Sequence, residues 1–566
     1  MTGDSRDRTD TVEGFVSAGG RHIVNGAGTP FLLRGVGLGS WLLPEGYMWG
    51  MPEGADRPRR IERLVSKLIG SKESERFWET YWDRYITEAD VRRIADEGFN
   101  SVRLPINARY LTGSDHSGTL LESRVARIDR LIEWCRRHRL YVILDLHGAP
   151  GGQTGTNIDD SAFDRPDLFV VAENQERTIE IWRSLAERYR DEWIVAGYDL
   201  LNEPLPNWFS EYNEQVLPLY RRITEAIREV DMRHMIILEG VHWATDWSIF
   251  TDRIDDNIML QFHKYWNNPD RESLKPYLSI RDAWNVPIFM GEGGENNSDW
   301  YAGAFRLFED LEISWNFWTW KKVDTTNSPA SIEKPEGWEE IVAVDVAEEN
   351  PPPDELCARH ILKEFLDNLS LDRCDYRGDV VRSLFRRPPV RIPAIFYAFE
   401  DRGRGYELSP HDHAGQPAGK RALPFRQGDG LHFGYVHNGS DRPSAERPPN
   451  FQHNRGEPWD AQDWIYLQLD PGAWVAYDFS TWQQTSQEEF YELTIRLACA
   501  EHGICAQVTI FVDQPQQELS IPINASEAAF HDYATSFQCE PGTRRLVVRA
   551  DTEAIRLQWL CVRMMQ

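Results

Sequence analysis

The sequence has no long hydrophobic run and no cluster of basic residues. None of its apolar stretches approaches the ~20 residues that a membrane-spanning helix needs. No run of five or more Lys and Arg occurs, and 62 basic against 90 acidic residues give a net charge of -28. Such a charge repels nucleic acids and anionic membrane surfaces. We therefore expect neither a membrane span nor a nucleic-acid partner.

Cysteine is scarce as well. The seven cysteines are scattered at positions 135, 357, 374, 499, 505, 539 and 561, with no CxxC pair and no histidine at zinc-ligand spacing. This pattern favours reduced thiols over a disulfide framework or a zinc site. Residues 1–13 are polar and lack the apolar segment of a secretory signal peptide, so we expect the protein to be cytoplasmic.

The first two thirds of the chain alternate two kinds of segment. Short apolar, β-branched runs are followed by longer segments of helical period, which is typical of parallel strands joined by crossover helices. Eight such strands, buried on both faces, predict a closed (β/α)8 barrel. The preceding stretch, 15–33, predicts a hairpin below the barrel. The predicted strands are residues 31–38, 99–106, 140–147, 195–204, 234–240, 258–265, 287–294 and 313–320.

The last third of the chain loses the helical period. Short alternating runs separated by turns predict a β-sandwich there. We therefore predict an α/β protein with a barrel domain at 1–375, a linker at 376–391 and a β-sandwich at 392–566. The predicted sandwich strands include residues 464–469, 474–479, 491–498, 506–512 and 545–549.

Polar side chains gather where the predicted barrel strands end, and barrels of this kind build their active sites at those ends. Glu203 lies at the end of the fourth strand and Glu292 at the end of the seventh, so the two carboxyl groups face each other across the barrel mouth. The other polar strand ends are Arg103, His147, Asn202, Glu239, His263 and Tyr265, and the eighth strand ends with Trp318 and Trp320.

Paired carboxyl groups are what glycoside hydrolysis needs. One must be protonated to assist the leaving oxygen, while the other stays ionised to attack or stabilise the anomeric carbon. Arg103 and Tyr265 are placed to donate hydrogen bonds that keep Glu292 ionised. The 22 tryptophans offer rings that stack on sugar faces, although many of them must belong to the core.

The motif Leu201-Asn202-Glu203-Pro204, together with Glu292 at the end of the seventh strand, resembles glycoside hydrolase family 5, within the retaining (β/α)8 glycosidases. The resemblance covers roughly residues 15 to 370, and the matching segments occur in the family's order on the expected strands. The further matches are Val102-Arg103-Leu104-Pro105, Asp145-Leu146-His147, Gln261-Phe262-His263-Lys264-Tyr265 and Trp315-Asn316-Phe317-Trp318.

The resemblance implies a double displacement without a metal or an organic cofactor. It makes Glu203 the acid/base and Glu292 the nucleophile, and it places Asn202 against the sugar 2-hydroxyl. The same resemblance gives the remaining residues their roles. Arg103, His263 and Tyr265 orient or tune the nucleophile, and His147 and Trp318 line the subsite of the sugar that is cut off.

Substrate choice follows from finer similarities. The segments 34–42 and 145–153 are similar to those of the exo-β-1,3-glucanase and β-glucosidase branch, which favours a β-glucoside or β-glucan oligosaccharide cut from a chain end. Gly293 departs from this branch, which usually has an aromatic residue after the nucleophile, and we expect a wider or reshaped pocket there. Mannosides, galactosides, arabinofuranosides and glycolipids stay open as substrates, as does endo-glucanase action.

The C-terminal region resembles carbohydrate-binding modules of families 6 and 35. The similar segments are Ile392-Pro393-Ala394, the stretch 472–477, Gly542-Thr543-Arg544-Arg545-Leu546 and Leu557-Gln558-Trp559-Leu560. A sandwich of purely structural function is the alternative for this region.

Two rival readings concern the barrel. One is a carbohydrate-binding protein without turnover, which the presence of both glutamates disfavours. The other is a metal-dependent hydrolase that uses Asp145, His147, His263 and Glu292 as ligands, although the His-x-His pair expected on the first strand is missing. The sequence leaves the oligomeric state open.

Overall fold

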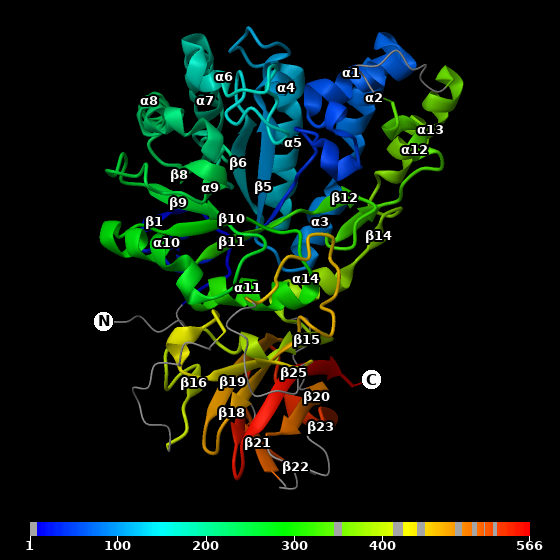
Figure 1. Cartoon of the computed structure of the whole chain (residues 1–566). Helices are drawn as coiled ribbons and strands as arrows, with labels where there is room; N and C mark the ends of the chain where they lie inside the picture. The colour runs from blue at the N-terminus through cyan, green and yellow to red at the C-terminus, as the bar shows by residue number, and fades with distance from the viewer. Residues whose placement is uncertain are drawn as a thin grey trace. The chain divides into compact units, whose positions relative to one another are not determined.

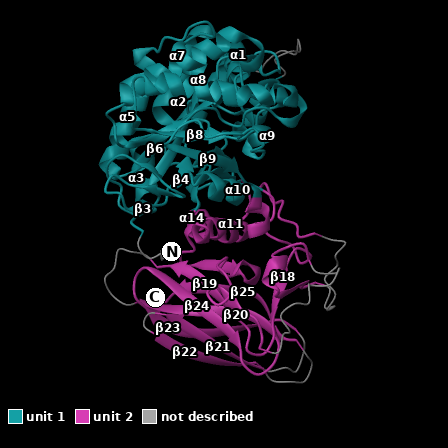
Figure 2. Cartoon of the chain, turned by 90° about the vertical axis from the view of Figure 1, so that its left-hand side faces the viewer, with its two compact units in different colours: residues 1–265, 276–294, 313–377 teal, residues 266–275, 295–312, 378–566 magenta. Residues whose placement is uncertain are grey.

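The computed structural model describes residues 8–344, 354–410, 423–437, 448–481, 489–500, 506–513, 516–523 and 529–565. Its internal contacts divide the chain into two compact units (Figure 2). The barrel unit comprises residues 1–265, 276–294 and 313–377, and the C-terminal unit comprises residues 266–275, 295–312 and 378–566. The domain boundaries predicted from the sequence, at residues 375 and 391, remain predictions.

Eight parallel strands close into a barrel in the order β10-β11-β4-β5-β6-β7-β8-β9, which confirms the predicted fold (Figure 1). The strands are short and buried along their length, because both of their faces are covered. Their bounds are β4 (Arg34–Gly37), β5 (Ser101–Asn107), β6 (Tyr141–Gly148), β7 (Val195–Asp199), β8 (Met235–Glu239), β9 (Ile258–His263), β10 (Ile288–Gly294) and β11 (Ser314–Trp318).

Helices follow the strands in the order expected of βα units. α5 (Glu122–His138) shows why: its apolar residues Val125, Ile128, Leu131 and Cys135 recur at helical spacing and are all buried. The other helices that connect barrel strands are α3 (Glu88–Asp96), α7 (Ala172–Tyr189), α8 (Val216–Arg228), α10 (Arg271–Trp284) and α11 (Ser298–Asp310), and α13 (Glu355–Asn368) follows the last strand.

The predicted N-terminal hairpin is present. β1 (Ser17–Gly19) and β2 (His22–Val24) pair antiparallel, and β3 (Pro30–Phe31) adds a third strand. The Tyr141 hydroxyl, at the first residue of β6, donates a hydrogen bond to the Glu13 carbonyl at 2.9 Å. The hairpin region is therefore fastened to the end of the barrel opposite the strand C-termini.

The C-terminal region folds into two antiparallel sheets, as the alternating runs predict. One sheet has the order β17-β18-β25-β20-β23 with β15 paired to β25, and the other has the order β16-β19-β24-β21-β22. Side chains alternate between buried and partly exposed along the longer strands, as in a sheet with one face in a core. The bounds of these strands are β15 (Val390–Pro393), β16 (Tyr406–Glu407), β17 (His432–Tyr435), β18 (Ile465–Leu469), β19 (Trp474–Ser480), β20 (Glu489–Cys499), β21 (Ala506–Asp513), β22 (Gln516–Ile523), β23 (His531–Cys539), β24 (Thr543–Ala550) and β25 (Ile555–Met564).

Six of the seven cysteines lie in the described part of the chain, and no disulfide joins any two of these six. Cys505 lies outside the described residues. Across the same part of the chain, no helix combines the length and the apolar character needed to cross a bilayer.

A buried ion pair joins the start of α3 to the strand that follows the barrel. Lys321, in β12 (Lys321–Val323), places Nζ 2.7 Å from Oδ1 of Asp90, and both side chains are fully buried. Asp90 also accepts hydrogen bonds from the Trp320 indole at 3.0 Å and from the Thr87 backbone at 2.9 Å, so it caps α3 at the same time.

Replacing Asp90 by Asn should therefore destabilise the barrel unit strongly. The change leaves the Lys321 ammonium buried without a counter-charge, which typically costs about 3–5 kcal/mol. The measurement is the urea midpoint followed by tryptophan fluorescence. Asp367→Asn is the control, because Asp367 pairs with Arg84 and Lys363 at the surface and such pairs contribute at most about 1 kcal/mol. Equal urea midpoints for the two variants would contradict the stabilising role of the Asp90–Lys321 ion pair.

Candidate active site

The structure brings all eight predicted site residues together in the barrel unit. Seven are buried, and Tyr265 is partly exposed. β7 ends at Asp199, earlier than the predicted strand 195–204, so Asn202 and Glu203 lie in the turn that follows it. Glu203 takes a left-handed backbone conformation (φ 45°), which is why the strand cannot continue through it. The other six are Arg103 in β5, His147 in β6, His263 and Tyr265 at and after the end of β9, Glu292 in β10 and Trp318 at the end of β11.

Glu292 is held through both carboxylate oxygens. Arg103 donates to Oε1 at 2.5 Å, and the Tyr265 hydroxyl donates to Oε2 at 2.7 Å. These are the two donors that the strand positions predict. Burial nevertheless raises the pKa of Glu292 above the ordinary value of 4.5, against the opposing charges of His263 and Arg103.

Glu203 faces Glu292 with His263 beside both. His263 Nδ1 lies 2.6 Å from Glu203 Oε1 and 3.7 Å from Glu292 Oε2. One ligand-type atom from each of the three side chains falls within 4.8 Å of the others. Carboxyl groups on the order of 5 Å apart are typical of retaining glycosidases, whereas inverting enzymes leave roughly 6.5–9.5 Å for a water molecule.

A hydrogen bond from the backbone fixes the unusual conformation of Glu203. Its N–H donates to Oε2 of Glu239 at 2.6 Å, and Glu239 is fully buried at the end of β8. Strained conformations persist where surrounding contacts determine them, and they cluster at functional sites. Glu239, which the sequence places at a strand end, therefore positions Glu203.

Arg103 is the central cation of the site. Its guanidinium contacts Asp145 at 3.1 Å, Asp199 at 2.8 Å, Glu239 at 3.0 Å and Glu292 at 2.5 Å. One cation cannot neutralise four carboxylates in a fully buried place. Burial accordingly raises the pKa of Asp145 to about 8 and that of Asp199 well above its ordinary range. Asp145 thus holds a proton at neutral pH, and the raised pKa of Asp199 favours its protonated form as well, which limits the negative charge of the cluster.

His263 is the second cation. Burial alone lowers its pKa, but the negative charges of Glu239, Glu292 and Glu203 outweigh burial and hold the pKa well above 6.5. The imidazole is therefore charged at neutral pH: Nδ1 donates a hydrogen bond to Glu203 Oε1, and Nε2 lies 3.4 Å from Glu239 Oε1.

His147 behaves in the opposite way. Burial lowers its pKa to about 4, so the ring is neutral at pH 7. Arg103 donates to Oδ1 of Asn202 at 2.8 Å, which turns the Asn202 amide nitrogen toward His147 Nε2, 3.2 Å away. Nε2 then accepts, and Nδ1 carries the proton toward Asp145 Oδ2 at 2.7 Å. The His147 ring stacks on Trp318, with centroids 5.6 Å apart and planes 5° apart.

Three further residues support the site, and the strand-end pattern does not reveal their roles. Gln261 points inward from β9, where its amide lies 3.0 Å from Asp199 Oδ2. Gln153 donates to the carbonyls of His147 at 2.7 Å and Asn202 at 2.9 Å. Tyr47 accepts from the Trp318 indole at 2.9 Å. Inward-pointing positions within β9 could have suggested Gln261. Tyr47 lies in the short 3-10 helix Gly46–Trp49, where no sequence signal pointed to it.

The glycines around Glu292 allow close packing. A Cβ at Gly291 would lie 2.1 Å from the Gln261 side chain, and one at Gly293 would lie 2.6 Å from the Lys264 carbonyl oxygen. The Lys264 backbone and the Met290 side chain occupy the space that a side chain at Gly293 would take, and the expectation of a wider or reshaped pocket there stays a prediction. Gly293 lets the ends of β9 and β10 approach each other.

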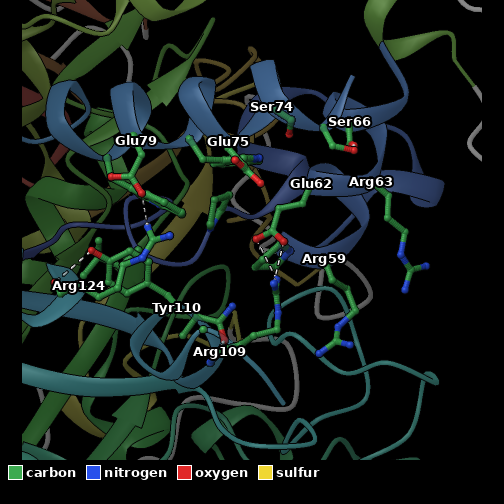
Figure 3. A pocket seen from close by; sticks show the side chains of 18 of the residues that line it. Arg59, Glu62, Arg63, Ser66, Ser74, Glu75, Glu79, Arg109, Tyr110 and Arg124 are labelled. Carbon is green, nitrogen blue, oxygen red and sulfur yellow. Dashed lines mark hydrogen bonds and ion pairs between the residues drawn. The ribbon is translucent and has the colours of Figure 1, made fainter. Parts of the chain in front are cut away.

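A separate hollow of about 1240 Å³ is lined by α1 (Pro58–Ile69) and α2 (Ser71–Arg84), and none of the eight predicted residues is among its described walls (Figure 3). Two ion pairs lie in its walls: Arg109 contacts Glu62 at 2.7 Å, and Arg124 contacts Glu79 at 3.1 Å. It is distinct from the carboxyl cluster.

The comparisons with known proteins agree with this geometry. The family model described as cellulase (glycosyl hydrolase family 5) matches residues 66–324. A β-xylosidase of Phanerodontia chrysosporium is 32% identical over 345 residues, which are 55% of this chain and 71% of the relative. The chain belongs to glycosyl hydrolase family 5. This family membership makes it an O-glycosyl hydrolase.

The chain is also similar to other glycosidases. A probable glucan 1,3-β-glucosidase A of Aspergillus fumigatus is 28% identical over 240 residues, covering 41% of this chain and 56% of the relative. The crystal structure of an endogalactoceramidase is similar at a TM-score of 0.45 and 15% identity, with 96% of this chain and 99% of that chain covered.

The different protonation states of His147 and His263 can be measured. In a pH titration of ¹⁵N-histidine-labelled protein, we expect the His147 imidazole to titrate near pH 4 and the His263 imidazole to stay doubly protonated through pH 7. His147→Gln and His263→Gln identify the two resonances. A His147 midpoint near 6.5, or a neutral His263 at pH 7, would contradict the charge assignment.

Proposed function

We propose that this family 5 member is a retaining β-glycosidase that removes sugars from the ends of β-glucosides or β-glucan oligosaccharides. The observation that carries the proposal is the close approach of Glu203 to Glu292, with Arg103 and Tyr265 bound to the latter. Exo action on a β-glucoside is supported by the segments at 34–42 and 145–153 and by the glucosidase relative.

In the proposed first step, a carboxylate oxygen of Glu292 attacks the anomeric carbon. The bond to the leaving oxygen breaks, its electron pair stays on that oxygen, and Glu203 supplies the proton. In the second step, Glu203 takes a proton from water, the water oxygen attacks the anomeric carbon, and the Glu292 carboxylate is released. Arg103 and Tyr265 stabilise this carboxylate before attack and after release.

His263 couples the two carboxyl groups. Its pKa is raised partly by the charge of Glu292, and esterification of Glu292 removes that charge. The protonated form of His263 is thus stabilised less in the intermediate, in which Glu203 must act as a base. Asn202, fixed by Arg103 and His147, is placed by the family resemblance against the sugar 2-hydroxyl.

A β-xyloside is the second candidate substrate. The relative that is 32% identical to this chain is named a β-xylosidase, and it covers more of this chain than the glucosidase relative does. Glucose and xylose differ by one hydroxymethyl group, so the same carboxyl pair serves either sugar.

The substrate test is a panel of nitrophenyl β-glucoside, β-xyloside, β-mannoside, β-galactoside and α-arabinofuranoside, with β-glucan oligosaccharides beside them. We expect one β-glycoside to be preferred. Glu292→Gln should lose at least about 10³-fold in kcat, because the nucleophile is removed. The control is Glu187→Gln, which makes the same change at an exposed residue of α7 and should keep wild-type rates. Wild-type turnover by Glu292→Gln would refute the assignment.

The proton-transfer role of Glu203 has its own signature. Glu203→Ala should retain the first step on aryl glycosides with acidic leaving groups, since these need little protonation. Added azide should restore the second step and release a glycosyl azide of retained configuration. An equal loss of activity on aryl glycosides with all leaving groups, with no glycosyl azide formed, would contradict the proton-transfer role of Glu203.

A further inference from the structure

Two tryptophans lie in contact on loops that follow neighbouring strands of the barrel. Trp208 belongs to the 3-10 helix Asn207–Gln215 after β7, and Trp243 belongs to α9 (Val241–Ala244) after β8 (Figure 1). Their ring centroids are 5.8 Å apart, and their planes meet at 67°. Both loops belong to the barrel unit and follow the C-terminal ends of their strands, which form the catalytic face of such a barrel.

The aromatic surface at these two loops is open to solvent. Trp208 is 59% exposed, and none of the nine residues of its helix is buried. Phe209 is half-buried, and its ring centroid lies 6.5 Å from that of Trp208. Neighbouring apolar rings that are exposed on a protein surface mark binding sites, since covering them removes apolar area from water. A sugar ring is a suitable occupant, because its C–H face covers an indole ring while its hydroxyl groups stay hydrated.

The loop after β8 holds Trp243 in an unusual backbone conformation. His242, Trp243 and Ala244 have φ values of 53°, 59° and 60°, in the left-handed region that residues other than glycine rarely adopt. Two backbone hydrogen bonds between Val241 and Asp246, each 2.9 Å long, close the loop. Such conformations persist where surrounding contacts enforce them, and they cluster at functional sites. The backbone that carries Trp243 is therefore fixed before a ligand binds, so that binding loses little entropy.

The same loop is bonded to the turn that carries Glu203. The His242 backbone N–H donates to the Leu205 carbonyl at 2.8 Å, and Leu205 comes two residues after Glu203. Trp208 comes five residues after Glu203, so their Cα atoms are at most about 18 Å apart. Glu292 lies on β10, with which neither β7 nor β8 pairs. The two tryptophans are thus on the Glu203 side of the barrel mouth.

The proposed mechanism decides which part of a substrate lies on this side. Glu203 gives its proton to the leaving oxygen, so the leaving group extends from the cut bond on the Glu203 side. We propose that Trp208 and Trp243 form an aromatic platform that binds a sugar ring of the leaving group. The inference rests on the proposed glycosidase function and adds to it the residues that recognise the leaving group.

The kinetic test compares a leaving group that reaches the platform with one that does not. A glycosyl fluoride releases only a fluoride ion, whereas the preferred tetrasaccharide releases a sugar. For Trp208→Ala, the ratio of kcat/KM on the tetrasaccharide to kcat/KM on the fluoride should fall about tenfold, because the aromatic contact is lost for the tetrasaccharide alone. Trp208→Phe keeps an aromatic ring and should retain most of the ratio.

The control is Trp134→Ala, which removes a partly exposed indole near the C-terminal end of α5 and should leave the ratio unchanged. Because Trp208 is largely exposed, its replacement leaves the core of the barrel intact. An unchanged ratio for Trp208→Ala, or an equal fall for Trp208→Ala and Trp134→Ala, overturns the proposal.

A binding test separates this proposal from the proposed function. Glu292→Gln and Glu292→Gln/Trp208→Ala are titrated calorimetrically with laminaritetraose, cellotetraose and xylotetraose. Binding by the first protein that weakens about tenfold in the second supports the platform, even if the wild type hydrolyses no glycoside and the proposed function fails. Equal binding by both proteins, or binding by neither, overturns the platform.

Discussion

The guanidinium of Arg103 holds the floor of the active site together. Its four carboxyl partners come from four different strands: Asp145 from β6, Asp199 from β7, Glu239 from β8 and Glu292 from β10. Since Arg103 itself belongs to β5, one cation ties five of the eight strands at their C-terminal ends. Removing Arg103 would leave buried carboxylates without this counter-charge, so the arrangement resists change.

The charges of the two histidines follow from this cluster. His263 lies beside Glu203, Glu239 and Glu292 and is held as a cation, while His147 lies beside Arg103 and Asp145 and stays neutral. The two histidines thus have different roles in the site. His263 contacts Glu203 through a charged hydrogen bond, whereas His147 accepts from Asn202 and stacks on Trp318. Neither role depends on the imidazole alone, because the neighbouring charges set both pKa values.

Two segments that follow barrel strands belong to the C-terminal unit. Residues 266–275 come directly after Tyr265, and residues 295–312 come directly after β10, which carries Glu292; both segments group with the sandwich region. Buried amides from Asn296 and Asn297 bind backbone carbonyls of the segment 451–457. A domain border drawn from sequence alone runs between residues 376 and 391, whereas these contacts join segments far apart in the chain.

The sequence alone was sufficient to predict the barrel and the two-sheet C-terminal region, and it indicated the eight residues that the structure brings together. Hydrophobic periodicity determines which segments become strands and helices, and a closed parallel barrel collects strand ends at one face. Only the tertiary structure decided the protonation of Asp145 and His147, the left-handed turn at Glu203, and the roles of Gln261 and Tyr47. These depend on burial and on distances between residues remote in sequence, which no local pattern encodes. The close packing at Gly293 is of the same kind, because the atoms that fill the space belong to another strand end and to a side chain folded back over it.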